Sequence, residues 1–108
     1  MSISSSKLNP GTTIGVDYAE VTTVPASTSS VVLFTSNLER VQGLIYNNST
    51  SALFLKFGSV VTPSDFSVRI PPKFYYELPI PVFFGEIHGV WDVANGDAKI
   101  TKFSKIPF

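Results

Sequence analysis

Residues 40–58, RVQGLIYNNSTSALFLKFG, carry the pattern that decides the fold. Two apolar runs flank a polar segment at residues 47–51. In the first run, Leu44 and Tyr46 fall on one side and Ile45 on the other, as the period-two geometry of a β-strand requires. The pattern predicts a β-hairpin whose polar tip, residues 47–51, faces outward.

The second run places apolar residues on both of its faces. Leu53, Leu55 and Phe57 share one side, whereas Phe54 falls on the other. A strand that is apolar on both faces must be covered on both. We therefore expect a central strand pair with a second sheet on one side and a loop or a neighbouring subunit on the other.

Short alternating segments continue on either side of this stretch, and none has a sustained helical period. Asn95-Gly96 is a strong signal for a turn between the last two segments, which predicts a second hairpin. About seven or eight strands spaced roughly 8 to 12 residues apart are typical of a β-sandwich. The segments are residues 14–24, 31–34, 40–46, 52–58, 65–70, 73–79, 86–92 and 98–103.

The sequence therefore predicts an all-β fold, an antiparallel β-sandwich or a jelly-roll-like domain. Residues 1–13 are rich in Ser and Thr and contain Asn9-Pro10-Gly11, which predicts an irregular N-terminal arm. Residues 14–108 are predicted to form one domain.

Composition narrows the classes of function. Eight Lys and Arg balance eight Asp and Glu in 108 residues, with no basic block, so nucleic acid is not an expected partner. The absence of cysteine excludes disulfides and thiol chemistry. No apolar run has the length of a signal peptide core or a membrane span, so no membrane association is expected. Only 15% of the residues are charged, which favours a surface partly covered by a partner.

Three polar groups are candidate sites of chemistry. His88 shares a strand face with Glu86, which would orient a general base, but sequence alone pairs no nucleophile with it. Asp92, Asn95 and Asp97 lack the oxygen spacing of a calcium loop, so turn formation explains them better. The overlapping sequons at Asn47 and Asn48 are interpreted as part of the polar tip. No enzyme activity, metal or cofactor is expected.

The aromatic residues allow two interpretations. Because alternation separates Phe74 and Tyr76 from Tyr75, and Phe83 from Phe84, some of these rings must leave the core. Exposed rings would contact a protein neighbour. Alternatively, Trp91 with Tyr75 or Tyr76 would stack on sugar rings in a carbohydrate-binding module.

An ordered series of segments in residues 45–103 resembles a module of small structural proteins of tailed bacteriophages. The segments are IYNNSTSALFLKFG, DFSVRIPP, YYELP and GEIHGVWDVANGDAKIT. The resemblance implies a β-domain that decorates or cements a capsid, or an adaptor of the neck, tail or fibre. It carries no catalytic residue.

On this resemblance we expect a non-enzymatic virion protein that is made in the host bacterial cytoplasm. Its partners would be the major capsid protein or another virion protein, and it would form a homo-oligomer. Exposure arguments give the expected interface residues, which are Ile3, Leu8, Pro10, Phe74, Tyr75, Tyr76, Pro81, Phe83 and Phe84.

Overall fold

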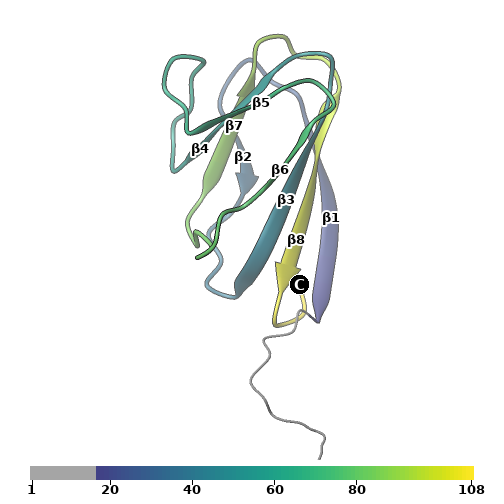
Figure 1. Ribbon diagram of the computed structural model, residues 1–108, viewed down its shortest axis with the longest axis vertical. Helices are drawn as coiled ribbons and strands as arrows, with labels where there is room; N and C mark the ends of the chain where they lie inside the picture. The colour runs from purple at the N-terminus through teal and green to yellow at the C-terminus, as the bar shows by residue number, and fades with distance from the viewer. Residues whose placement is uncertain (1–16) are drawn as a thin grey trace, which may run out of the picture.

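The alternating segments form strands in the computed structural model, which describes residues 17–108 (Figure 1). Within this range every regular element is a strand, and no helix that could span a membrane is present. The strands are β1 Tyr18–Pro25, β2 Val31–Phe34, β3 Arg40–Asn48, β4 Leu53–Phe57, β5 Val68–Ile70, β6 Tyr75–Glu77, β7 Ile87–Trp91 and β8 Asp97–Ser104.

The strands form two four-stranded antiparallel sheets that face each other. Sheet A has the order β1-β8-β3-β6, and sheet B has the order β2-β7-β4-β5. Of the seven connections between successive strands, only β4–β5 joins neighbours in one sheet; the other six cross between the sheets. Eight antiparallel strands wound between two sheets in this way form a jelly roll. The predicted all-β class is confirmed.

Both predicted hairpins are wrong, although their strands are correctly placed. β3 pairs with β8 and β6 in sheet A, whereas β4 pairs with β7 and β5 in sheet B. β7 and β8 likewise belong to different sheets. We reserve the word arch for those crossing connections that lie at the end of the sandwich where β3 ends and β4 begins. Four arches, β1–β2, β3–β4, β5–β6 and β7–β8, lie at one end of the sandwich, the arch end, at the top of Figure 1.

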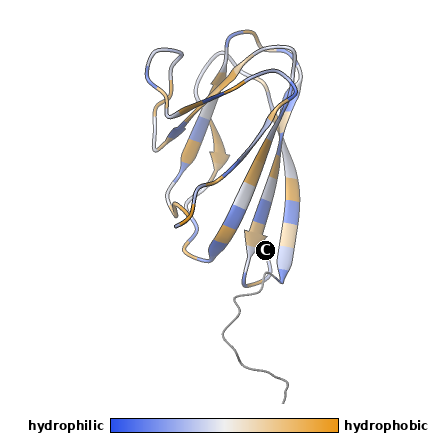
Figure 2. Cartoon of the chain, in the orientation of Figure 1, coloured by the Kyte–Doolittle hydropathy of each residue, from blue (hydrophilic) through white to orange (hydrophobic). Residues whose placement is uncertain are grey.

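The main core fills the space between the sheets. Alternation along β3, β7 and β8 points every second side chain inward, and the polar and apolar bands of Figure 2 follow this period. Burial of these side chains is the main contribution to stability. The cluster consists of Leu33, Phe34, Ile45, Leu53, Leu55, Ile70, Leu78, Ile87, Trp91, Ala98 and Ile100.

A second, smaller cluster covers the outer face of sheet B. Phe54 and Val90 point away from the main core and pack with Ala52 and Val61. The β4–β5 loop, residues 58–67, supplies Val61, and the ring of Phe66 lies 4.9 Å from that of Phe54. The loop therefore covers this part of the outer face, which is one of the two coverings that the sequence predicts.

The polar segment at residues 47–51 does not face outward as expected. Asn47, Ser49 and Ser51 are buried inside the arch end. The Asn47 amide donates to the carbonyl oxygens of Ser51, at 2.8 Å, and Ile70, at 3.0 Å. Its Oδ1 accepts a hydrogen bond of 3.2 Å from Trp91 Nε1. These bonds stabilise the buried polar groups of three neighbouring arches.

The β3–β4 and β7–β8 arches also bind each other directly. Asn95 Oδ1 accepts hydrogen bonds from Ser49 Oγ at 3.1 Å and from the backbone N–H of Thr50 at 3.1 Å. Gly96 has a φ of +71°, and a side chain there would overlap the carbonyl oxygen of Asn48. The Asn-Gly pair thus forms a turn as predicted, but the turn packs on a second arch instead of closing a hairpin.

We expect Asn47→Leu to lower the free energy of unfolding by about 2–4 kcal/mol, because it leaves several buried donors and acceptors without partners. Urea unfolding followed by Trp91 fluorescence measures the loss. Thr50→Ala, an exposed change in the same arch, is the control and should cost less than about 1 kcal/mol. Equal effects of the two variants would contradict the structural role assigned to Asn47.

Candidate interaction surface

Exposed apolar side chains gather at the end of the sandwich opposite the arches. Three segments meet there: the β2–β3 loop, residues 35–39; the β6–β7 loop, residues 78–86; and residues 105–108. Leu38 is 79% exposed, and Phe84, Ile106 and Phe108 are also exposed. We call these four residues the apolar end. Large exposed apolar groups gathered in this way are typical of a contact surface.

Backbone hydrogen bonds hold the three segments together. Asn37 N donates to Phe84 O at 2.9 Å, which joins the two loops, and Lys105 N donates to Glu39 O at 3.4 Å. Asn37 Oδ1 accepts from Glu39 N at 2.9 Å, which is the local turn that asparagine favours. The apolar side chains are therefore presented from loops with a defined conformation.

Arg40 lies beneath these loops and is only 5% exposed. Its guanidinium donates to the carbonyl oxygens of Thr35, Phe83 and Gly85, the last at 3.2 Å, and lies 5.0 Å from the centre of the Phe34 ring. Burial lowers the pKa of Arg40 from its ordinary value by desolvation. The side chain thus fastens the β2–β3 loop to the β6–β7 loop.

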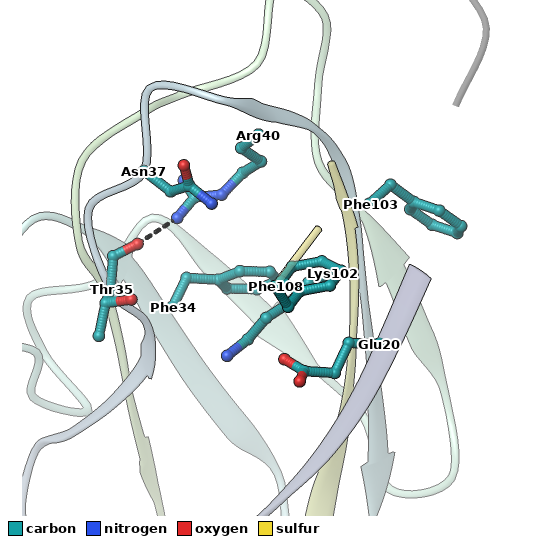
Figure 3. Close-up of a pocket in the computed structure, with 8 residues that line it drawn as sticks. All are labelled: Glu20, Phe34, Thr35, Asn37, Arg40, Lys102, Phe103 and Phe108. Atoms are coloured by element: carbon teal, nitrogen blue, oxygen red, sulfur yellow. Dashed lines mark hydrogen bonds between the residues drawn. The ribbon is translucent and has the colours of Figure 1, made fainter. Parts of the chain in front are cut away.

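Two cavities adjoin Arg40 from different sides. One, of about 320 Å³, lies between sheet A and the β2–β3 loop, and Figure 3 shows the Arg40 guanidinium beside the Thr35 carbonyl there. The second, of about 220 Å³, runs between Leu38 and Phe84 at the surface. The first is lined by Glu20, Phe34, Thr35, Asn37, Arg40, Lys102, Phe103 and Phe108. The apolar end is therefore indented rather than flat.

The structure does not bring the predicted interface residues into one patch. Phe74 and Tyr75 are exposed at the arch end, where Phe74 O accepts from Asn47 N. Phe83 and Phe84 lie near the other end of β3, where Arg40 donates to Phe83 O. Arg40 is seven residues from Asn47, so the two groups are roughly 23 Å apart at 3.3 Å per residue along that strand. Pro81 is exposed in the β6–β7 loop.

One of the remaining interface residues, Tyr76, lies differently from expectation, and the other three cannot be placed. The Tyr76 side chain packs against the main core, so its assignment to a surface is wrong in large part. Ring contact with Phe57, at 5.6 Å, also occupies one side of Phe83. Ile3, Leu8 and Pro10 lie outside the described residues.

Trp91 cannot act as a stacking platform in this structure. The residue is 1% exposed, packs in the main core and donates its indole N–H to Asn47. Alternation placed it correctly on one face of β7, but that face is the inner one. The prediction of an exposed Trp91 is wrong, whereas Tyr75 is 69% exposed and accessible to a ligand.

The structure adds a serine to the His88–Glu86 pair that the sequence could not supply. Ser30 Oγ lies 3.2 Å from His88 Nδ1, and His88 Nε2 lies 3.0 Å from Glu86 Oε1. A serine, a histidine and a carboxylate in a chain are the components of nucleophilic catalysis. Ser30 Oγ, however, also accepts from Val61 N at 3.2 Å, and none of the three residues lines either cavity. In this arrangement the hydrogen bonds of Ser30 with His88 and with Val61 N fix the β4–β5 loop on sheet B.

Neither metal chemistry nor similarity to other proteins assigns a site. Residues 17–108 contain no group of three or more His, Asp or Glu side chains placed to hold a metal ion. Asp92 and Asp97 instead flank the turn in which Asn95 binds the neighbouring arch. No family model, curated protein or solved structure matches the chain. The geometry of the apolar end is therefore the basis for a function.

We expect Arg40→Met to lower the free energy of unfolding by about 1–3 kcal/mol, because three carbonyl oxygens lose their donor. Limited proteolysis should also cut the loops at residues 35–39 and 78–86 faster than in the parent protein. Arg69→Met, on the exposed side of β5, is the control, with a change within about 0.5 kcal/mol. Unchanged cleavage of both loops in Arg40→Met would contradict the fastening role.

Proposed function

We propose that this protein is a non-enzymatic structural subunit of a tailed-phage virion, which binds the assembled capsid as a decoration or cement protein. The observation that carries the proposal is the apolar end, where Leu38 and Phe84 project from loops held by Arg40. The resemblance of residues 45–103 to phage structural modules supports the same role. Neck, tail or fibre attachment is the alternative within this class.

A cement role would follow from mass action. A subunit that binds the assembled shell, and not its separate parts, stabilises the shell by its binding free energy. Many copies on one particle also gain avidity from weak individual contacts. Loops whose conformation is already set lose little conformational entropy on docking, which favours such contacts.

Carbohydrate binding is retained only in a reduced form. Trp91, one of the stacking residues proposed from the sequence, is buried in the core. This alternative therefore depends on Tyr75 and its exposed neighbour Phe74 at the arch end. Because Tyr75 and Leu38 lie at opposite ends of the sandwich, substitutions at the two ends separate glycan binding from capsid binding.

The protein should cosediment with capsids of the phage that encodes it, and the double variant Leu38→Glu/Phe84→Glu should lower its bound fraction at least tenfold. Placing charge in an apolar contact costs desolvation without a partner. The control is Val93→Glu, which changes an exposed apolar residue at the arch end. Wild-type protein that remains in the supernatant with capsids, tails and fibres alike would remove the proposal.

The non-enzymatic part of the proposal is tested at Ser30. Because Ser30 Oγ accepts a hydrogen bond from Val61 N and borders neither cavity, we expect no covalent labelling by a fluorophosphonate probe. Intact-mass spectrometry detects a single adduct. Labelling that disappears in Ser30→Ala and in His88→Gln, with the fold retained by circular dichroism, would instead indicate a serine hydrolase.

A further inference from the structure

The four edge strands of the two sheets differ sharply in how they are protected against pairing. β5 and β6 have three residues each, and β2 has four with a register shift between Val32 and Phe34. Short strands and irregular register are common ways of blocking edge-to-edge association. β1, by contrast, runs for eight residues in unbroken register with β8, from Tyr18 to Pro25.

β1 also carries few of the side chains that protect an edge, with Glu20 as its single charge. The segment YAEVTTVP contains no Lys or Arg, and its proline is the last residue. Val21, near the middle of the strand, is 63% exposed. Within residues 17–108, β8 is the one strand that pairs with β1. The other edge of β1 is therefore open in the described part of the chain.

Backbone geometry shows which groups of β1 point outward. Ala26 N donates to Gly96 O, and these two residues continue the register in which Val24 faces Ala98. Hydrogen-bonded pairs alternate along an antiparallel ladder. The even-numbered residues of β1 are therefore bonded to β8, and the N–H groups of Ala19, Val21 and Thr23 point to the open edge.

We propose that the open edge of β1 binds β1 of a second copy of this chain, antiparallel and about a two-fold axis at Val21. Val21 then pairs with its own symmetry mate, and Ala19 pairs with Thr23. Each of these pairs exchanges two backbone hydrogen bonds, as the outward direction of the odd-numbered groups requires. The two copies of sheet A become one continuous eight-stranded sheet, with the same surface used on both sides.

The sequence of β1 is self-complementary in this register. Tyr18 lies opposite Val24, and Glu20 lies opposite Thr22, so no like charges meet. The two Val21 side chains meet at the axis on the outer face of the sheet, where they cover each other from water. Pro25, which lacks an N–H group, falls at the end of the ladder, where the loss is least. A second copy is therefore the occupant that these residues favour.

Two variants at the axis test this pairing by sedimentation equilibrium. The parent chain should show twice the monomer mass in a concentration-dependent manner. Val21→Pro removes an N–H that makes no bond to β8, so it should weaken dimerisation on the order of 30-fold or more while leaving the fold intact. Val21→Thr keeps the N–H and should dimerise within about threefold of the parent. A parent chain that stays monomeric up to roughly 1 mM overturns the proposal.

Amide hydrogen exchange on the unmodified protein gives a test that needs no variant. In the dimer, the amides of Ala19, Val21 and Thr23 should be protected together with those of Glu20 and Thr22. On dilution to the monomer, only the odd-numbered amides should lose protection. Odd-numbered amides that stay protected in a monomer would mean that residues 1–16 or another part of the same chain occupies the edge, which also overturns the proposal.

This inference is independent of the proposed function, because it concerns isolated protein without any particle. A dimer that does not cosediment with capsids would remove the virion role and retain the β1 pairing. A chain that stays monomeric but cosediments with capsids would remove the β1 pairing and retain the virion role.

Discussion

The fold depends on the buried amide of Asn47, which sits where the strands pass from one sheet to the other. An amide inside an apolar core is tolerated only when its donors and acceptor are paired. Asn47 meets this requirement with the carbonyl oxygens of Ser51 and Ile70 and with the indole N–H of Trp91. These groups belong to three different arches, so the requirement holds the arches together. It also fixes the orientation of the largest side chain in the core.

Period-two alternation was sufficient to predict the class of fold and most strand positions, because burial on one side dictates the residue type. It could not predict strand partners. Two strands joined by a short polar segment have the same pattern whether they bond to each other or face each other across a core. β3 and β4 face each other, and the deciding signal is the burial of Asn47, Ser49 and Ser51. Polar residues of this kind read as an exposed turn when their hydrogen-bond partners are distant in the sequence.

The same limitation applies to the candidate site. Leu38, Arg40 and Phe84 come from segments that resemble ordinary loops and strand ends, and only the tertiary fold brings them to one end. Ser30 lies 58 residues from His88, so their contact has no local signature. Alternation did predict that the aromatic residues would be divided between core and surface. It did not identify which face was inner, and for this reason Trp91 was placed outside and Tyr76 at a contact.

The pairing of β1 with β8 has a consequence for folding during synthesis. Tyr18 lies opposite Ser104, so the two strands that complete sheet A are separated by almost the whole chain. Sheet A cannot close on the ribosome until residue 104 has emerged, and until then β1 lacks β8, the strand with which it pairs. Pairings between such distant segments form slowly, because loop-closure entropy is lost before contacts compensate for it. Nascent chains would therefore expose the YAEVTTVP segment during synthesis, and protection by a chaperone would matter most in that interval.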